Sequence, residues 1–151
     1  MESNAAQTQN PALEPLGILA GEWRTEGTHP YIPDTTLHGS AQIAWIEGGA
    51  FLIMRSHIDD ERIPDGIEIF GSDDALKAFF MLHFDERGVS RKYEVSFERN
   101  VLTWQRDDPH FLQRMVLTIS DDGNTIESRG EMNRDKAGWE PDLQLTYTRI
   151  S

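Results

Sequence analysis

The most limiting absence in this chain of 151 residues is cysteine, of which there is none. Without cysteine there is no disulfide, no thiolate metal ligand and no cysteine nucleophile, and redox conditions put no constraint on the compartment. Basic residues are also scarce, because 14 Lys and Arg stand against 26 Asp and Glu, for a formal net charge of −12. The chain has no Lys/Arg cluster that could displace counterions from phosphates, so we expect it to bind neither nucleic acid nor an anionic membrane surface.

Long apolar runs are missing as well. No stretch approaches the roughly 18 apolar residues of a membrane span. The opening residues, MESNAAQTQN, have neither the basic start nor the apolar run of a secretory signal, so we expect a cytoplasmic protein. An apolar share of 38% and a charged share of 26% are typical of a globular chain. The length predicts a single domain over 11–151, after a disordered leader over 1–10.

The chain does contain a series of short β-strand patterns. Apolar and polar residues alternate between Gly, Asp and Asn turns that recur about every 8–14 residues. Before them, Leu13, Leu16 and Leu19 lie at helical spacing and predict a helical turn or two. The predicted strands are 20–28, 38–47, 50–58, 65–72, 77–85, 89–98, 101–107, 111–120, 124–133 and 141–150.

The connections between these segments are too short for the crossover helices that parallel strands require, which predicts an antiparallel meander. A meander of about ten strands removes its exposed edges most simply by closing on itself. We therefore predict an all-β fold, an antiparallel up-and-down barrel of about ten strands with a short N-terminal helical turn. A barrel of this size leaves an interior large enough for one small ligand.

The two ends of the strand region carry a Gly-x-Trp and an arginine. Trp23 follows Gly21 where the chain enters its first strand, and in the last strand Tyr147 and Arg149 share one face with two leucines. Because that face is otherwise apolar or aromatic, we expect it to point inward. Arg149 would then lie at one end of the barrel, where its guanidinium stacks on an indole and caps backbone carbonyls. We interpret these residues as scaffold.

Three stretches carry a family resemblance: LAGEWRTEGTHPYIP over 19–33, IEGGAFL over 46–52 and LQLTYTRI over 143–150. The chain after residue 12 resembles the nitrobindin-like, fatty-acid-binding-protein-like branch of the calycin barrels, which includes bacterial proteins of the DUF1579 kind. The resemblance implies a ten-stranded antiparallel calycin or lipocalin-like barrel with a central cavity. Haem-binding nitrobindins carry an iron-ligating histidine at the start of the last strand, where this chain has Pro141 and Asp142. Because a carboxylate does not replace a neutral imidazole there, we predict no cofactor and expect no haem.

The segment 89–98 offers a candidate for recognition of an anion. One of its faces is fully polar, so the other face, with Arg91 and Tyr93, is expected to point inward. A buried arginine is costly unless its charge meets a carboxylate or a bound anion. Two interpretations stay open. Arg91 forms a salt bridge within the barrel, or it binds an anionic group of a ligand, with the Tyr93 hydroxyl as a second donor.

The segments 50–58 and 77–85 each have one mixed face and one nearly all apolar face. If the mixed faces point inward, a polar cavity is lined by Arg55, His57, Met81 and His83. The apolar faces would then form an outer patch of the kind that marks a homodimer interface. If the apolar faces point inward, His57 and His83 face outward. The strand pattern does not choose between these arrangements.

The leading functional hypothesis is binding of one small, partly apolar molecule, with or without an anionic group, inside the barrel. The alternative is an isomerase, cyclase or hydrolase that uses His83, His57 or Glu68 for acid/base chemistry in the same cavity. A binder of haem or nitric oxide and a purely structural homodimer are less favoured. The five histidines show no metal-ligand spacing, so no metal site is predicted. The predicted ligand-binding residues are Arg91, Tyr93, His83, Met81, Arg55, His29, Trp104 and Tyr147.

Overall fold

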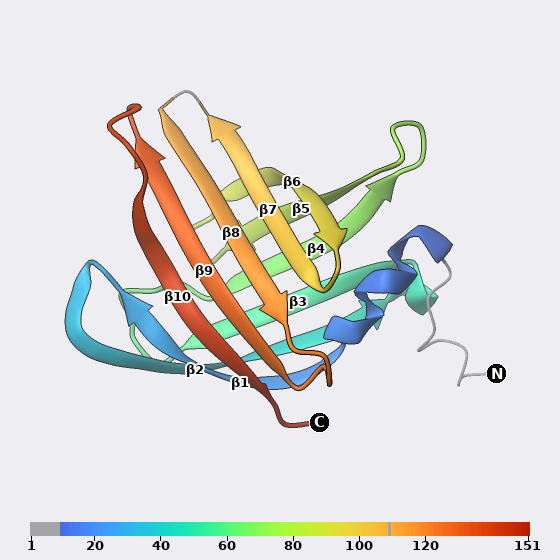
Figure 1. The fold of residues 1–151 in the computed structure, drawn as a ribbon, viewed down its shortest axis with the longest axis horizontal. Coiled ribbons are helices and arrows are strands. Elements are labelled where there is room, and N and C mark those ends of the chain that lie inside the picture. The colour runs from blue at the N-terminus through green and yellow to red at the C-terminus, as the bar shows by residue number, and fades with distance from the viewer. Residues whose placement is uncertain (1–9, 109) are drawn as a thin grey trace.

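The computed structural model describes residues 10–108 and 110–151 and shows a closed barrel (Figure 1). All neighbouring strands are antiparallel, in the order β1-β10-β9-β8-β7-β6-β5-β4-β3-β2, which confirms the predicted all-β, calycin-like up-and-down architecture. The 3₁₀ helix η2 (Pro11–Leu19) precedes β1, and the short turn η3 (Glu47–Gly49) joins β2 to β3. The strands are β1 (Gly21–His29), β2 (Ile32–Ile46), β3 (Phe51–Ile58), β4 (Gly66–Asp73), β5 (Ala78–Asp85), β6 (Ser90–Glu98), β7 (Val101–Asp108), β8 (Phe111–Ile119), β9 (Thr125–Arg134) and β10 (Glu140–Arg149).

The largest departure from the predicted strand bounds is at β2, which begins at Ile32 instead of residue 38. Its first residues pair with β1 alone, and the ladder to β3 begins only at Gly39. In this stretch β2 therefore has a free edge. A free edge tolerates Pro33, which has no N–H to donate, and Asp34, whose φ is 56°. The β1–β2 hairpin consequently extends beyond the body of the barrel (Figure 1).

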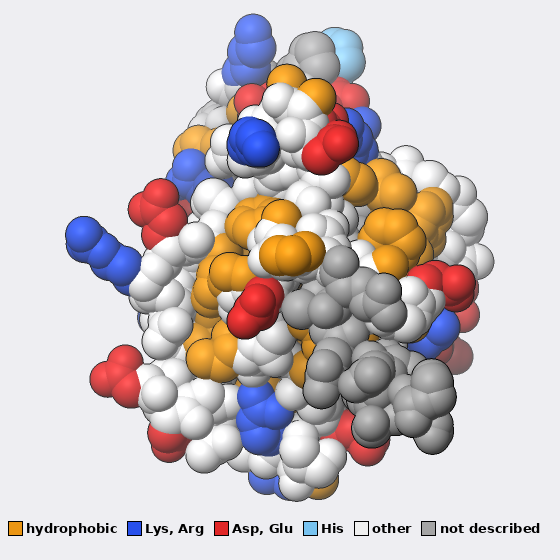
Figure 2. All heavy atoms as spheres, turned by 90° about the vertical axis from the view of Figure 1, so that its right-hand side faces the viewer, with side chains coloured by type: hydrophobic (Ala, Val, Ile, Leu, Met, Phe, Trp, Pro, Cys, Tyr) orange, Lys and Arg blue, Asp and Glu red, His pale blue; other side chains and the backbone are white. Residues whose placement is uncertain are grey.

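The helix η2 closes one end of the barrel. Its leucines at helical spacing, Leu13, Leu16 and Leu19, are all buried, and the helix packs on β3 and β4. Asn10 accepts a hydrogen bond from the Ala12 N–H at 3.1 Å and so caps the helix. The rest of the predicted leader, residues 1–9, lies outside the described residues. Figure 2 looks at this end of the molecule and shows hydrophobic side chains gathered in the middle of the face, with charged ones around them.

Trp23 and Arg149 seal this end, as the sequence predicts. The guanidinium carbon of Arg149 lies 4.3 Å from the centre of the Trp23 ring. The Trp23 indole N–H donates to the Leu19 carbonyl at 3.0 Å. Arg149 caps three backbone carbonyls from two segments, donating to Ile18 at 2.7 Å and Ala20 at 2.6 Å at the end of η2, and to Gly123 at 3.0 Å in the β8–β9 connection. The start and the end of the chain's barrel region are thereby joined.

Strands β3 and β5 turn opposite kinds of face toward the interior. In β3 the apolar side points inward, with Leu52 and Met54 buried and Arg55 exposed. In β5 the mixed side points inward, with Met81 buried and Phe84 on the outside at 37% exposure. The two arrangements considered from the sequence, in which both strands turn the same kind of face inward, are therefore wrong. The outer face of the sheet carries a run of apolar neighbours in register, namely Ile53, Ile69 and Leu82, with Ile67 and Phe84 beside them.

Within the described residues, no helix is both long enough and apolar enough to cross a bilayer.

Candidate functional site

A cavity of about 620 Å³ occupies the barrel interior and opens at the end away from η2. Its rim comes from the connections that follow β1, β3 and β5, represented by Tyr31, Ile63 and Arg87. The cavity wall extends as far as Thr25 and Tyr147. These two register partners lie two residues along their strands from Trp23 and Arg149, the pair that seals the floor. The cavity thus lies between an open rim and a closed floor, as expected for a barrel that encloses a small molecule.

Most of the predicted site residues line this cavity. Arg55 does not, because β3 turns its mixed face outward and places Arg55 beside Ile67 on the outer surface, so the predicted position of Arg55 is wrong. Of the acid/base candidates, Glu68 and His83 lie on the cavity wall, whereas His57 is an exposed residue at the rim. The remaining predicted residues that line the cavity are Arg91, Tyr93, Met81, His29, Trp104 and Tyr147.

Arg91 and Tyr93 project inward from β6 and meet at one amide of β8. The Tyr93 hydroxyl donates to Oε1 of Gln113 at 2.7 Å, and the Arg91 guanidinium donates to the same oxygen at 3.2 Å. Gln113 Nε2 donates in turn to Asp142 Oδ2 at 3.2 Å, and the other oxygen of Asp142 lies 3.2 Å from His29 Nε2. This polar chain crosses the cavity from β6 through β8 and β10 to β1.

The charge of Arg91 is not neutralised within the barrel. The other arginines that line the cavity each face a carboxylate, but Arg91 has no ion pair with any residue the structure describes. Its guanidinium meets the neutral amide of Gln113 and the Phe111 ring, whose centre is 5.9 Å away. The intramolecular salt bridge, the first of the two interpretations from sequence, is thus not formed among the described residues. Burial raises the pKa of the Tyr93 phenol against the opposing influence of Arg91, so its hydroxyl remains a donor.

A second polar group lies on the β4–β5 side of the cavity. Glu68 Oε2 is 2.5 Å from Nδ1 of His83, and Nε2 of His83 is 3.2 Å from Asp85 Oδ2. Asp85 also accepts two hydrogen bonds from the Arg87 guanidinium, which lower the pKa of Asp85. Burial raises the pKa of the Glu68 carboxyl. Burial would lower the pKa of His83, but the hydrogen bonds and charges of Glu68 and Asp85 outweigh it and raise that pKa.

The histidines that line the cavity have no ring nitrogen to offer to a metal. Haem or metal ligation needs a free imidazole lone pair, and both nitrogens of each ring already have a partner. Within the described part of the chain, no group of His, Asp and Glu side chains is arranged to hold a metal ion. These residues therefore do not fit haem. The ring partners are Asp142 and the Tyr31 N–H for His29, Asp59 and Asp65 for His57, and Glu68 and Asp85 for His83.

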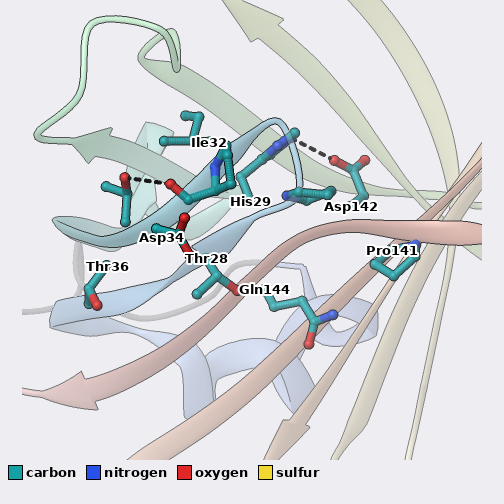
Figure 3. A pocket seen from close by; sticks show the side chains of 11 residues that line it. Thr28, His29, Ile32, Asp34, Thr36, Pro141, Asp142 and Gln144 are labelled. Carbon is teal, nitrogen blue, oxygen red and sulfur yellow. Dashed lines mark hydrogen bonds and ion pairs between the residues drawn. The ribbon is translucent and has the colours of Figure 1, made fainter.

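A smaller cleft of about 400 Å³ lies beside the rim, between the β1–β2 hairpin and the start of β10 (Figure 3). The β1–β10 ladder ends at Thr28 and Gln144, so beyond that point the two strands diverge. The ion pair of His29 and Asp142, drawn as a dashed line in Figure 3, bridges this gap. Both residues also line the main cavity, so the pair separates the cleft from the interior.

Sequence reasoning missed Gln113 and Thr25 as site residues. Gln113 gave a usable signal, because it is the polar member of the otherwise apolar inward face of β8. Thr25 gave none, because a threonine on an inward strand face is ordinary and nothing in the sequence shows whether its hydroxyl finds a partner. Asp142 was considered only as a replacement for a haem ligand, although it anchors the polar chain across the cavity.

Comparison with known proteins agrees with the architecture. Neither a protein-family model nor the sequence of a curated protein matches this chain. The crystal structure of Rv2717c from M. tuberculosis is similar, with a TM-score of 0.67 and 15% identity over 94% of this chain and 99% of that chain. An S-type phycobiliprotein lyase, CPES from Guillardia theta, is similar with a TM-score of 0.58 and 9% identity, over 99% of this chain and 97% of that chain. At such low identity these likenesses show the shared fold, a calycin-like barrel.

Proposed function

We propose that this barrel binds one small, partly apolar molecule that carries an anionic group, with Arg91 and Tyr93 as the anchors of that group. The single observation that carries the proposal is the half-buried guanidinium of Arg91, which faces the cavity without an ion pair among the described residues. A charge removed from bulk water is costly unless a counter-charge compensates it. A bound carboxylate would supply that counter-charge and accept a second hydrogen bond from Tyr93.

The rest of the cavity suits the apolar part of such a molecule. Met54, Met81 and Leu145 are buried on its walls, and Trp104 contributes an aromatic surface. Pockets for small molecules are commonly apolar with a few polar groups that fix orientation. Methionine side chains are flexible, so the walls can adapt to ligands of different shape. The fold shared with a phycobiliprotein lyase supports the proposal through its architecture alone.

The proposal is tested by binding of two anionic apolar probes, anilinonaphthalene sulfonate and dodecanoic acid. We expect the purified protein to bind both, and Arg91→Met to weaken each by at least about tenfold, the effect of one hydrogen bond to a charged group. Tyr93→Phe should weaken both by a smaller factor. Arg55→Met is the matched control, because it removes an arginine from the outer surface and should leave the affinities unchanged. Affinities that Arg91→Met leaves at the wild-type level would overturn the proposal.

Acid/base catalysis in the same cavity is the second candidate. It is favoured by the buried carboxylate of Glu68, whose raised pKa is typical of catalytic acids and bases. Because both ring nitrogens of His83 are engaged, Glu68 is the member of the pair that would exchange a proton with a bound molecule. An isomerase or cyclase should catalyse deuterium incorporation at the acidic C–H of an oxo acid such as levulinic acid. Glu68→Gln should abolish that exchange, and absence of exchange in the wild type would count against catalysis of this type.

Three further predictions accompany the proposal: membership of the nitrobindin-like or DUF1579-like group, a cytoplasmic location and a homodimer. The homodimer prediction rests on the apolar neighbours Ile69, Leu82 and Phe84 on the outer face of β4 and β5. Sedimentation velocity tests it, with Leu82→Lys as the variant that should dissociate a dimer formed through this face. A wild-type protein that sediments as a monomer would remove this prediction. Cell fractionation tests the location.

A further inference from the structure

The deep end of the cavity holds two hydroxyl groups without a hydrogen-bond partner. Thr25 of β1 and Tyr147 of β10 are register partners, and both side chains point inward at 3% and 5% exposure. The Oγ1 of Thr25 is buried and makes no hydrogen bond with any described residue. The hydroxyl of Tyr147 likewise makes none with any residue that the structure describes, and its ring meets the Trp23 ring edge-on at 6.2 Å. A buried hydroxyl ordinarily has a hydrogen-bond partner, so the Oγ1 of Thr25 indicates a missing one.

The wall of the same cavity also carries a buried carboxylate. Glu68 is 5% exposed and lines the cavity together with Thr25 and Tyr147. Burial and the Glu68 charge together raise the pKa of Tyr147. Glu68 already shares its charge with His83, so an ammonium group in this place would not be fully neutralised. A neutral group that both donates and accepts suits these three residues best.

We propose that this deep end is a second subsite that takes a neutral hydroxyl of the ligand. The ligand hydroxyl would donate to Glu68 and accept from Thr25 or Tyr147. Together with the anion anchor, on which this inference rests, the subsite defines the ligand class as an apolar molecule with an anionic group at one end and a hydroxyl at the other.

The two subsites lie at different depths along the barrel. Arg91 is the second residue of β6, next to the connection at the open rim, whereas Tyr147 is two residues from Arg149, which seals the floor. The cavity wall also includes the buried apolar side chains of Met81 and Leu145. A ligand that reaches both subsites must therefore have a length that matches this separation, and affinity should depend on chain length.

The experiment compares saturated monocarboxylic acids of increasing chain length with their ω-hydroxy derivatives, by displacement of anilinonaphthalene sulfonate. In the wild type we expect the hydroxyl to improve affinity by about tenfold at one matching chain length and to weaken it at the others, because a hydroxyl on an apolar wall has no partner. Thr25→Val and Tyr147→Phe keep the shapes of the side chains and remove their hydroxyls. Each should reduce the ratio of the affinity for the hydroxy acid to the affinity for its parent acid at the matching chain length.

The outcomes separate this inference from the proposed function. If the hydroxy acids bind no better than their parents at any chain length in the wild type, the hydroxyl subsite is overturned, and water is then the partner of Thr25 and Tyr147. This comparison does not depend on whether the variants fold. If Arg91→Met leaves the affinity for the parent acids unchanged, the anion anchor fails instead, whatever the hydroxyl preference shows.

Discussion

The carboxylate of Glu68 and the imidazole of His83 face each other as register partners of β4 and β5, with Oε2 2.5 Å from Nδ1. This pairing accounts for the inward orientation of the mixed face of β5. Each group would be costly inside the barrel alone, but the adjacent strand supplies the opposite charge at hydrogen-bond distance. Because successive side chains alternate, Leu82 and Phe84 then point outward, where they have apolar neighbours on the outer face of β4.

Stability should fall with rising pH because of this pair. The raised pKa of His83, above its ordinary 6.5, means that its stabilising contribution is complete below about pH 6.5 and is lost as the pH rises through the folded-state value. The raised pKa of Glu68 has the same sign, since the folded state holds that proton more tightly than the unfolded state does. We therefore expect the free energy of unfolding in urea to decrease between about pH 6.5 and 9.

The matched control for this pH dependence is the double variant Glu68→Gln with His83→Gln, which keeps polar side chains at both positions and removes both titrations. Its unfolding free energy should change less over the same pH range than that of the wild type. A wild-type stability that rises across this range, or a double variant with the same slope, would contradict the assignment. Circular dichroism at each pH confirms that both proteins start folded.

Strand positions were predictable because the alternation of apolar and polar residues and the positions of turn residues are local properties of the sequence. The inward faces were predictable only where one face is plainly polar, as in β6, where Arg91 and Tyr93 point inward as expected. For β3 and β5 the outcome depends on what the neighbouring strand supplies. Met54 of β3 enters the core, whereas His83 of β5 enters because Glu68 lies opposite it. The alternation pattern of one strand does not show which residues of the neighbouring strand lie opposite it, so the inward face of β5 could not be predicted from its own sequence.

The candidate site was predictable in part for the same reason. Arg91 and Tyr93 could be placed inside, but the absence of a carboxylate beside Arg91 depends on which residues of β8 and β10 face it. Gln113, a neutral amide, occupies that place. The free hydroxyl of Thr25 is likewise a property of the packed barrel, because it depends on the groups around it and not on its own position in the sequence.

Gly27 is required where the barrel closes. A Cβ at this position would lie 1.8 Å from the backbone oxygen of Gln144, in the β1–β10 ladder, where neither strand can move without breaking hydrogen bonds. We expect Gly27→Ala to lower the free energy of unfolding by more than about 3 kcal/mol in a urea titration. Gly88→Ala is the control, because Gly88 has a φ of +85° but a Cβ there would have no atom of a described residue within 4 Å, and the substitution should cost about 1 kcal/mol. Equal effects of the two substitutions would contradict the steric argument.

Arg149 stabilises the sealed end through its carbonyl contacts and its stack on Trp23. Arg149→Met keeps an unbranched apolar stem and removes the guanidinium, leaving the capped carbonyls without their donor. We expect a loss of about 2–4 kcal/mol in the free energy of unfolding, which is larger than a surface substitution gives. Arg129→Met, at an exposed position of β9, is the control and should change stability by less than about 0.5 kcal/mol. Similar losses in both variants would show that the carbonyl contacts contribute little.

Addition of haemin should give no Soret band of a histidine-ligated haem. A free nitrogen on His29, the histidine closest to the start of β10, would require loss of its contact with Asp142 or of the hydrogen bond from the Tyr31 N–H. Asp142 in turn is held by Gln113, so displacing His29 would disturb the polar chain that leads to Arg91. Absorption spectroscopy of the wild type and of His29→Ala tests this expectation. A ligated Soret band in the wild type that His29→Ala abolishes would show that the energy of iron ligation exceeds that of these contacts.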